Sequence, residues 1–138
     1  MSFQITTTIQ INATPEKVWQ ELLNFKEYPT WNPFIKEIKG TPKKGARLEV
    51  DMQGMTFKPV VLQCRHNKEF TWRGSLFING LFDGEHSFLL EQKSSGTTQF
   101  TQSEKFSGIL VPLLKGKLQK ETKEQFKAMN AALKKRME

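Results

Sequence analysis

The chain has 138 residues, 37% of them hydrophobic, and a net charge of +7 from 21 basic and 14 acidic side chains. This length suits a single domain spanning residues 1–138, and the apolar residues recur from end to end, which excludes a disordered chain. No apolar run approaches the roughly 20 residues of a membrane-spanning helix, so membrane insertion is not expected.

The positive charge is spread along the chain rather than concentrated in one cluster. Near the C-terminus lysines alternate with glutamates, as in KLQKETKEQFK, which is typical of a solvated helix face, so nucleic-acid binding is not expected. The single cysteine, Cys64, cannot form an internal disulfide, and the N-terminal residues lack the pattern of a signal peptide. Both observations favour a reducing, cytoplasmic location.

Histidine and cysteine are too scattered to predict a metal site. The two histidines, His66 and His86, lie far apart in sequence, and no Cys/His cluster has metal-ligand spacing. We therefore expect neither a metal ion nor another cofactor.

The N-terminal third predicts a strand, a short helix and a loop. Residues 3–11, FQITTTIQI, alternate apolar and polar side chains, which predicts a strand. Thr14 suits the N-cap and Pro15 the first position of a helix over residues 15–25. Pro29 is expected to end the helical region. The segment TWNPFIKEIKG, residues 30–40, is then predicted to begin as a loop.

The middle of the chain predicts six short strands separated by turn residues. The predicted strands are residues 34–39, 47–53, 60–66, 69–77, 81–91 and 97–106. The dipeptide Asn79-Gly80 is a strong hairpin signal. Short turns between successive strands indicate an antiparallel meander.

From residue 112 to 133 apolar side chains recur at steps near 3.6, which predicts one long amphipathic helix of about 20 residues. The segment before it, residues 108–116, combines leucines with bracketing glycines and suits either a mobile lid or a plain connector. The predicted fold is α+β: a curved antiparallel sheet of about seven strands wraps around the C-terminal helix, with a short helix after the first strand.

A sheet that curls around a helix leaves a cavity where the two layers separate. Alternation places His86, Gln102 and Glu104 on the same strand faces as the apolar core residues, so all three are expected to point inward. Burying them unpaired is costly. They pair with one another, with trapped water or with the polar end of a ligand, and His86 with Glu104 has the chemistry of an acid–base pair.

Three stretches carry a resemblance to a known family: ATPEKVWQELLNFKEYPTWNPF, WRGSLFINGLFDGEHSFLLE and TQFTQSEKFSGILVPLL. With the terminal helix, they make the chain resemble the START/SRPBCC superfamily, the helix-grip fold, and within it the small bacterial polyketide cyclase/dehydrase-like proteins. The resemblance covers nearly the whole chain and implies binding of an apolar molecule. It also implies that Trp31 and Phe34 lie near the mouth of the cavity, with Asn32 and Pro33 shaping the turn.

The leading functional hypothesis is binding of a small, mostly hydrophobic ligand in the cavity between sheet and helix. Arg73 should alternate to the outer face of the sheet. The residues expected at the ligand are Trp31, Phe34, Val50, Met52, Leu62, Trp72, His86, Phe88, Phe100, Gln102, Glu104, Leu110, Phe126 and Met129.

Two alternatives stand beside ligand binding. One is a polyketide cyclase/dehydratase-like enzyme that uses His86 and Glu104 as acid–base groups. The other is a protein-interaction module resembling activators of heat-shock ATPases, which would use the leucines of residues 109–114 as its contact surface. The sequence carries no signal for a particular oligomeric state.

Overall fold

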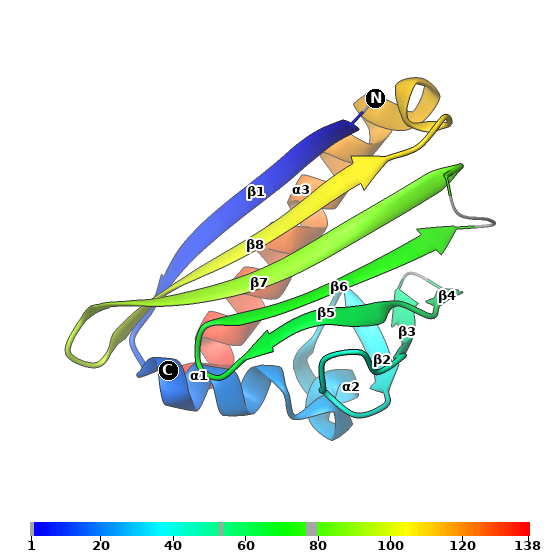
Figure 1. The fold of residues 1–138 in the computed structure, drawn as a ribbon. Coiled ribbons are helices and arrows are strands. Elements are labelled where there is room, and N and C mark those ends of the chain that lie inside the picture. The colour runs from blue at the N-terminus through cyan, green and yellow to red at the C-terminus, as the bar shows by residue number, and fades with distance from the viewer. Residues whose placement is uncertain (1, 53, 77–79) are drawn as a thin grey trace.

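The computed structural model describes residues 2–52, 54–76 and 80–138. Figure 1 shows the elements in chain order. They are β1 (Ser2–Ile11), α1 (Pro15–Leu22), the 3-10 turn η1 (Phe25–Glu27), α2 (Tyr28–Trp31), β2 (Ile35–Lys39), β3 (Glu49–Met52), β4 (Met55–Phe57), β5 (Val60–Arg65), β6 (Glu69–Leu76), β7 (Phe82–Ser94), β8 (Thr97–Ser107) and α3 (Val111–Met137). The predicted positions Phe77 and Asn79 lie outside the described residues.

The strands form two antiparallel sheets rather than the single sheet expected. One has five strands in the order β1-β8-β7-β6-β5, and the other has three in the order β2-β3-β4. The segment before β3 joins them, because Gly45 N donates to Val61 O and Leu48 N donates to Pro59 O, both at 2.8 Å. The described residues thus form one bent β-layer with two parts (Figure 1).

The helical region after β1 differs from the prediction at its C-terminal end. Thr14 caps α1 as expected, with its hydroxyl accepting from Lys17 N at 3.3 Å. The helix ends at Leu22, however, and Pro29 lies in the first turn of the short helix α2 instead of ending the helical region. Proline suits a first turn because that position needs no backbone N–H. Trp31 is therefore the last residue of a helix and not part of a loop.

Asn32 makes the sharp exit from α2 into β2. Its side-chain oxygen accepts from the backbone N–H groups of Phe34 at 2.9 Å and Ile35 at 2.8 Å. An asparagine that satisfies two backbone donors stabilises a tight turn. This turn points Phe34 into the interior, where it is buried.

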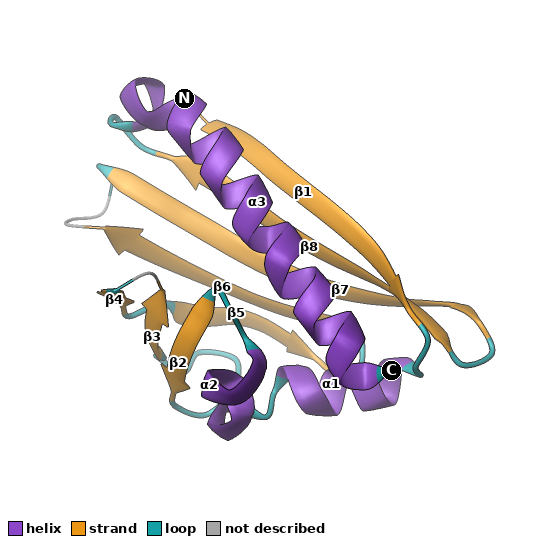
Figure 2. Cartoon of the chain, turned by 180° about the vertical axis from the view of Figure 1, so that it is seen from behind, coloured by secondary structure: helices purple, strands orange, loops and turns teal. Residues whose placement is uncertain are grey.

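Helix α3 lies along one face of the five-stranded sheet (Figure 2). It packs chiefly on β1, with fewer contacts to β8, and its C-terminal half buries Phe126, Met129 and Leu133. With 27 residues it is longer than predicted. Because the helix lies towards the β1 edge, it leaves the inner face of β6 and β7 uncovered along its N-terminal half.

The segment 108–116 is a turn followed by the first residues of α3. Gly108 has φ +120°, and a Cβ there would collide with the backbone oxygen of Leu81. Glycine is needed at this position because other residues rarely adopt that conformation. Val111 is already the first residue of α3. In this structure the segment is therefore a connector, one of the two alternatives that the sequence allowed.

The inner face of the sheet is built from aromatic rings, as strand alternation predicted. Phe70, Phe88 and Phe100 are fully buried on three neighbouring strands, and the Phe70–Phe88 and Phe88–Phe100 ring centroids lie 6.4 and 6.0 Å apart. His86, Gln102 and Glu104 also point inward, as expected. Arg73 is exposed on the outer face, also as expected, and lies 3.5 Å from Asp83.

Candidate functional site

An apolar pocket of about 320 Å³ lies between the sheet and the N-terminal half of α3. Three parts of the chain form most of its wall: strands β6, β7 and β8, the β3–β4 hairpin, and one side of α3. Phe34 and Pro59, which lie just before β2 and β5, complete it. The lining residues are Phe34, Met52, Met55, Phe57, Pro59, Trp72, Gly74, Ser75, Phe82, Gly84, Glu104, Phe106, Leu114, Lys117, Leu118, Glu121, Thr122 and Gln125.

Two glycines create the floor of this pocket. Gly74 on β6 and Gly84 on β7 are directly paired across the strands, and both line the pocket. A Cβ at residue 84 would lie 2.5 Å from Oε2 of Glu104, and one at residue 74 would lie 3.3 Å from Cβ of Pro59. The two glycines therefore make room for the Glu104 carboxylate and for Pro59, at positions where aromatic rings stand elsewhere on the same face.

Glu104 is the carboxylate on the inner face of the sheet at this pocket. It is only 8% exposed, and it lines the pocket next to Gly84. Its Oε1 atom lies 3.0 Å from Nδ1 of His86, its register partner on β7. Nδ1 makes no well-aligned hydrogen bond within the described part of the chain, so this contact is electrostatic rather than a hydrogen bond of good geometry.

His86 lies behind Glu104 and does not line the pocket. Its ring is fully buried among Phe34, Trp72, Phe88 and Phe126, whose centroids lie 4.5–6.3 Å from its own. Its Nε2 atom is 2.8 Å from Oε1 of Gln102. A ligand in the pocket would therefore meet Glu104 and not the imidazole.

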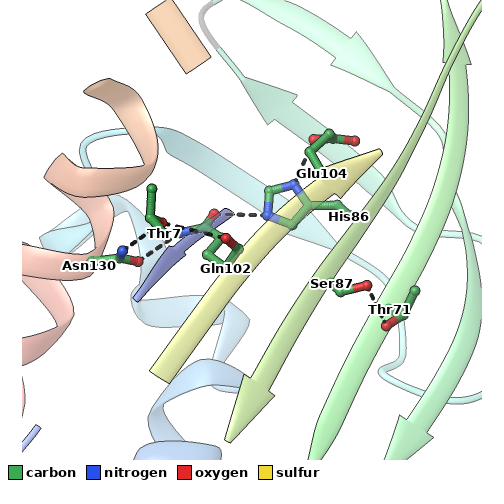
Figure 3. A network of polar contacts seen from close by, with 7 residues as sticks. All are labelled: Thr7, Thr71, His86, Ser87, Gln102, Glu104 and Asn130. Atoms are coloured by element: carbon green, nitrogen blue, oxygen red, sulfur yellow. Dashed lines mark hydrogen bonds and ion pairs between the residues drawn. The ribbon is translucent and has the colours of Figure 1, made fainter. Parts of the chain in front are cut away.

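A chain of buried polar groups continues from His86 to helix α3 (Figure 3). Gln102 Nε2 donates to Asn130 Oδ1 at 2.9 Å, and Asn130 Nδ2 donates to Thr7 Oγ1 at 2.9 Å. The Thr7 hydroxyl is 3.5 Å from the backbone oxygen of Gln102. These bonds satisfy polar groups that would otherwise be costly to bury, and they hold His86 and Glu104 in place.

The mouth of the pocket carries the charges of α3. Lys117 and Glu121 lie four residues apart on the helix, and both line the opening. Two apolar side chains near the start of the helix point elsewhere: Ile109 is 73% exposed and Leu113 is 83% exposed. Neither lines the pocket.

A second hollow, of about 400 Å³, lies on the outer face and has a different character. Arg73, Asp83, Glu85 and Lys105 line it. A hydrogen bond from the Ser75 side chain, the N–H of Gly80 and the charge of Arg73 together hold the pKa of Asp83 below its ordinary value. Arg73 and Asp83 form an ion pair at 3.5 Å between Nη2 and Oδ2, and the hollow offers little apolar surface to a hydrophobic molecule.

The structure divides the fourteen predicted ligand residues among the pocket, the polar chain and the core. Phe34, Met52, Trp72 and Glu104 line the pocket. His86 and Gln102 belong to the buried polar chain. The residues fully buried in the core, away from the pocket lining, are Val50, Phe88, Phe100, Phe126 and Met129.

The remaining three predicted residues, Trp31, Leu62 and Leu110, are partly buried and do not line the pocket. Trp31 packs on Tyr28, with ring centroids 5.3 Å apart. Leu62 was expected on the inner face, but the fully buried residue of β5 is Val61, because the register shifts between Val61 and Gln63. A bulge of this kind reverses which residue of a strand faces inward.

Sequence reasoning missed the side of α3 that faces the pocket and, in the β3–β4 hairpin, Met55 and Phe57 of β4. Leu114 and Leu118 belong to the predicted apolar stripe, but they face the pocket instead of the sheet. The glycine pair was a usable signal, because Gly74 and Gly84 interrupt two faces that otherwise carry aromatic residues. Their effect depends on being paired across the strands, which only the register reveals.

An antiparallel layer bent around one long helix, with an apolar pocket between the two, defines a START/SRPBCC-like protein with the helix-grip fold. The profile of the family described as polyketide cyclase / dehydrase and lipid transport matches residues 2–138, and the chain belongs to this family. A search among curated proteins found no match.

Solved structures share this fold at low sequence identity. A hypothetical protein from Helicobacter pylori superposes with a TM-score of 0.85 at 15% identity, over 99% of this chain and 88% of the other. A START superfamily protein from Mycobacterium smegmatis gives 0.76 at 19% identity, over 97% and 96%. Norcoclaurine synthase from Thalictrum flavum, a point mutant in complex with a transition-state analogue, gives 0.76 at 14% identity, over 99% and 94%.

Residues 2–52, 54–76 and 80–138 contain no group of three His, Cys, Asp or Glu side chains placed to hold a metal ion. Within the same residues, no helix combines the length and apolar character needed to cross a membrane.

Proposed function

We propose that this single-domain protein binds a small, mostly hydrophobic molecule in the pocket between the sheet and the N-terminal half of α3. The observation that carries the proposal is the pocket itself, whose surface is mostly apolar and which is not filled by side chains. Apolar pockets with a few polar groups are the usual form of small-molecule sites. The family description, which includes lipid transport, supports the same class of ligand.

The binding energy available from such a pocket is moderate. Burying about 200 Å² of apolar ligand surface contributes about 5 kcal/mol at roughly 25 cal/mol per Å². Loss of translational and rotational freedom offsets part of that contribution. A ligand that reaches micromolar affinity, about −8 kcal/mol, must therefore bury more surface or add a polar contact.

The test fills the pocket from α3 and measures binding of the neutral apolar fluorophore N-phenyl-1-naphthylamine. Leu118→Trp places a large ring in the lining, and we expect probe affinity to fall at least tenfold. Leu113→Trp makes the same change five residues earlier, at a position that is 83% exposed and outside the lining, so it should bind like the wild type. Equal binding by both variants, or no binding by the wild type, would refute the proposal.

A second candidate function is a cyclase or dehydratase acting on a polyketide-like substrate. One observation favours it: an acid–base pair, Glu104 with His86, adjoins the pocket. In that case Glu104 is the group that touches the substrate, while His86 exchanges a proton with it from behind. Replacing Glu104 by Gln should then abolish turnover of a substrate found to co-purify with the protein, as identified by native mass spectrometry.

The protein-interaction alternative has weaker support. This alternative predicts two features, a filled interior and an exposed apolar patch. The structure has the patch, at Ile109 and Leu113, but its interior holds an unfilled pocket. We also favour a cytoplasmic location, because the one cysteine, Cys64, is free.

A further inference from the structure

We propose that the pocket selects apolar molecules whose polar group donates a hydrogen bond, such as an alcohol, a phenol or an amine, and that it rejects carboxylates. This inference rests on the proposed function and names the ligand's chemical class. It follows from two features of Glu104. One is the carboxylate oxygen that a ligand would meet, and the other is the position of the proton between Glu104 and His86.

The electrostatic contact between His86 and Glu104 is favourable when one of the two groups carries a proton on the side that faces the other. Nδ1 and Oε1 are 3.0 Å apart and almost fully buried. Two lone pairs facing each other at that distance away from water would be strongly unfavourable. Either His86 carries the proton and faces a carboxylate, or Glu104 carries it on Oε1 and faces the neutral ring.

The polar chain behind His86 is compatible with both placements. With Gln102 donating to Asn130 and Asn130 donating to Thr7, Oε1 of Gln102 accepts from an Nε2–H of His86. In this arrangement the proton between Nδ1 of His86 and Oε1 of Glu104 belongs either to the ring or to the carboxyl group. If the side-chain amides of Gln102 and Asn130 were both rotated by 180°, the amide nitrogen of Gln102 would donate to Nε2 of His86. The ring proton would then be on Nδ1, on the side of Glu104. Each arrangement puts the shared proton on the Oε1 side.

When the proton lies between Nδ1 and Oε1, the other oxygen of Glu104, Oε2, is left to accept a hydrogen bond. Oε2 lies 2.5 Å from the position that a Cβ of Gly84 would take, and both residues line the pocket. Glu104 makes no hydrogen bond to the residues that the structure describes outside its contact with His86. Oε2 is thus a hydrogen-bond acceptor presented to the pocket, and a donor on the ligand can satisfy it.

The same geometry disfavours an anionic ligand, although the protein as a whole carries a charge of +7. A carboxylate placed against Oε2 would bring two acceptors, and often two negative charges, together in apolar surroundings. Among the lining residues that the structure describes, the one cation is Lys117, on α3 at the mouth. An anionic head would have to bind there, with the tail of the molecule against Glu104.

The experiment compares three ligands with the same chain: decan-1-ol, methyl decanoate and decanoate, each displacing N-phenyl-1-naphthylamine from the wild-type protein at pH 7.5. We expect the alcohol to bind about tenfold more tightly than the ester, as a hydrogen bond to a charged group implies. Decanoate should bind most weakly. Affinities within twofold of each other, or tightest binding by decanoate, would overturn the inference while leaving the proposed function intact.

Two matched variants locate the effect. Glu104→Leu removes the acceptor and should reduce the preference for the alcohol over the ester to less than twofold, with probe binding retained. Glu124→Leu makes the same substitution at an exposed position of α3 outside the lining, and it should keep the tenfold preference. A preference that persists in Glu104→Leu, or disappears in Glu124→Leu, would contradict the assignment to Glu104. If Glu104→Leu does not fold, the wild-type ligand series decides alone.

Discussion

Gln102 and Asn130 join the centre of the five-stranded sheet to helix α3 through a hydrogen bond of 2.9 Å. Both side chains are buried, and Asn130 also donates to Thr7 on the edge strand β1. Apolar packing tolerates small rotations of a helix, whereas a buried amide pair has few satisfied geometries. This bond therefore sets how α3 lies on the sheet, and with it the pocket on the same helix.

Replacing Asn130 by Leu should destabilise the protein by about 1–3 kcal/mol, because Gln102 then has an unpaired buried amide. Urea unfolding measures the change. Lys127→Leu, at an exposed position one turn earlier, is the control and should change stability little. In the double variant with Gln102→Leu the loss should be smaller than the sum of the single losses, and strict additivity would contradict this pairing.

Replacing Phe126 should destabilise the protein more than replacing any exposed residue of α3. Its ring is fully buried and lies 5.6 Å from Phe34 and 4.9 Å from His86, measured between centroids. Phe126→Ala should cost about 3–5 kcal/mol, since it leaves a cavity in a packed core. Leu113→Ala, at an exposed site, should cost less than about 0.5 kcal/mol. Thermal unfolding compares the two, and similar losses would contradict this placement of α3.

Gly116 and Gly108 should respond in opposite directions to the same substitution. Gly116 is exposed inside α3, and a Cβ there would meet nothing within 4 Å. Gly116→Ala should stabilise the protein by about 0.5–1 kcal/mol, because glycine is a poor helix former. Gly108→Ala should destabilise it, because the positive φ and the Leu81 carbonyl exclude a Cβ. Chemical denaturation tests both, and stabilisation by both would show that the turn tolerates a side chain.

Asp83 should make stability depend on pH in acid. Its pKa is held below the ordinary value, first by a hydrogen bond from Ser75 and then by Gly80 N–H and Arg73. Asp83 therefore binds a proton more readily in the unfolded chain than in the folded one. The stabilisation by ionised Asp83 is present above its unfolded-state pKa of about 4, and it is lost as the pH falls through the folded-state pKa. Asp83→Asn should be less stable than the wild type at pH 7, and the difference should narrow towards pH 3.

Urea unfolding at pH 7 and pH 3 measures that difference directly. Glu91→Gln, on the exposed end of the same strand, serves as the control. The other titrating groups are common to Asp83→Asn and the wild type, so the change in their difference isolates Asp83. A stability difference between Asp83→Asn and the wild type that is as large at pH 3 as at pH 7 would contradict this role of Asp83.

Strand alternation was sufficient to orient the side chains of the central strands. The patterns around Phe88 and Phe100 correctly predicted that His86, Gln102 and Glu104 point inward, because neighbouring residues on an extended strand face opposite sides. Alternation failed at Leu62, where a bulge shifts the register of β5. It also could not show that Gly74 and Gly84 are partners, since pairing depends on two strands at once.

The amino-acid sequence by itself determined the order of the main elements, though not α2 or β4, and the inward face of the central strands, because these depend on periodicity and on residue types within each segment. The helix-grip class came from the resemblance of three stretches to a known family. Only the tertiary structure decided where the interior is hollow. Helix α3 packs towards β1, so the space opens over the glycine pair, and Glu104 reaches it while His86 is enclosed by rings. The distance between two layers arises from the packing of many side chains together, and no single segment encodes it.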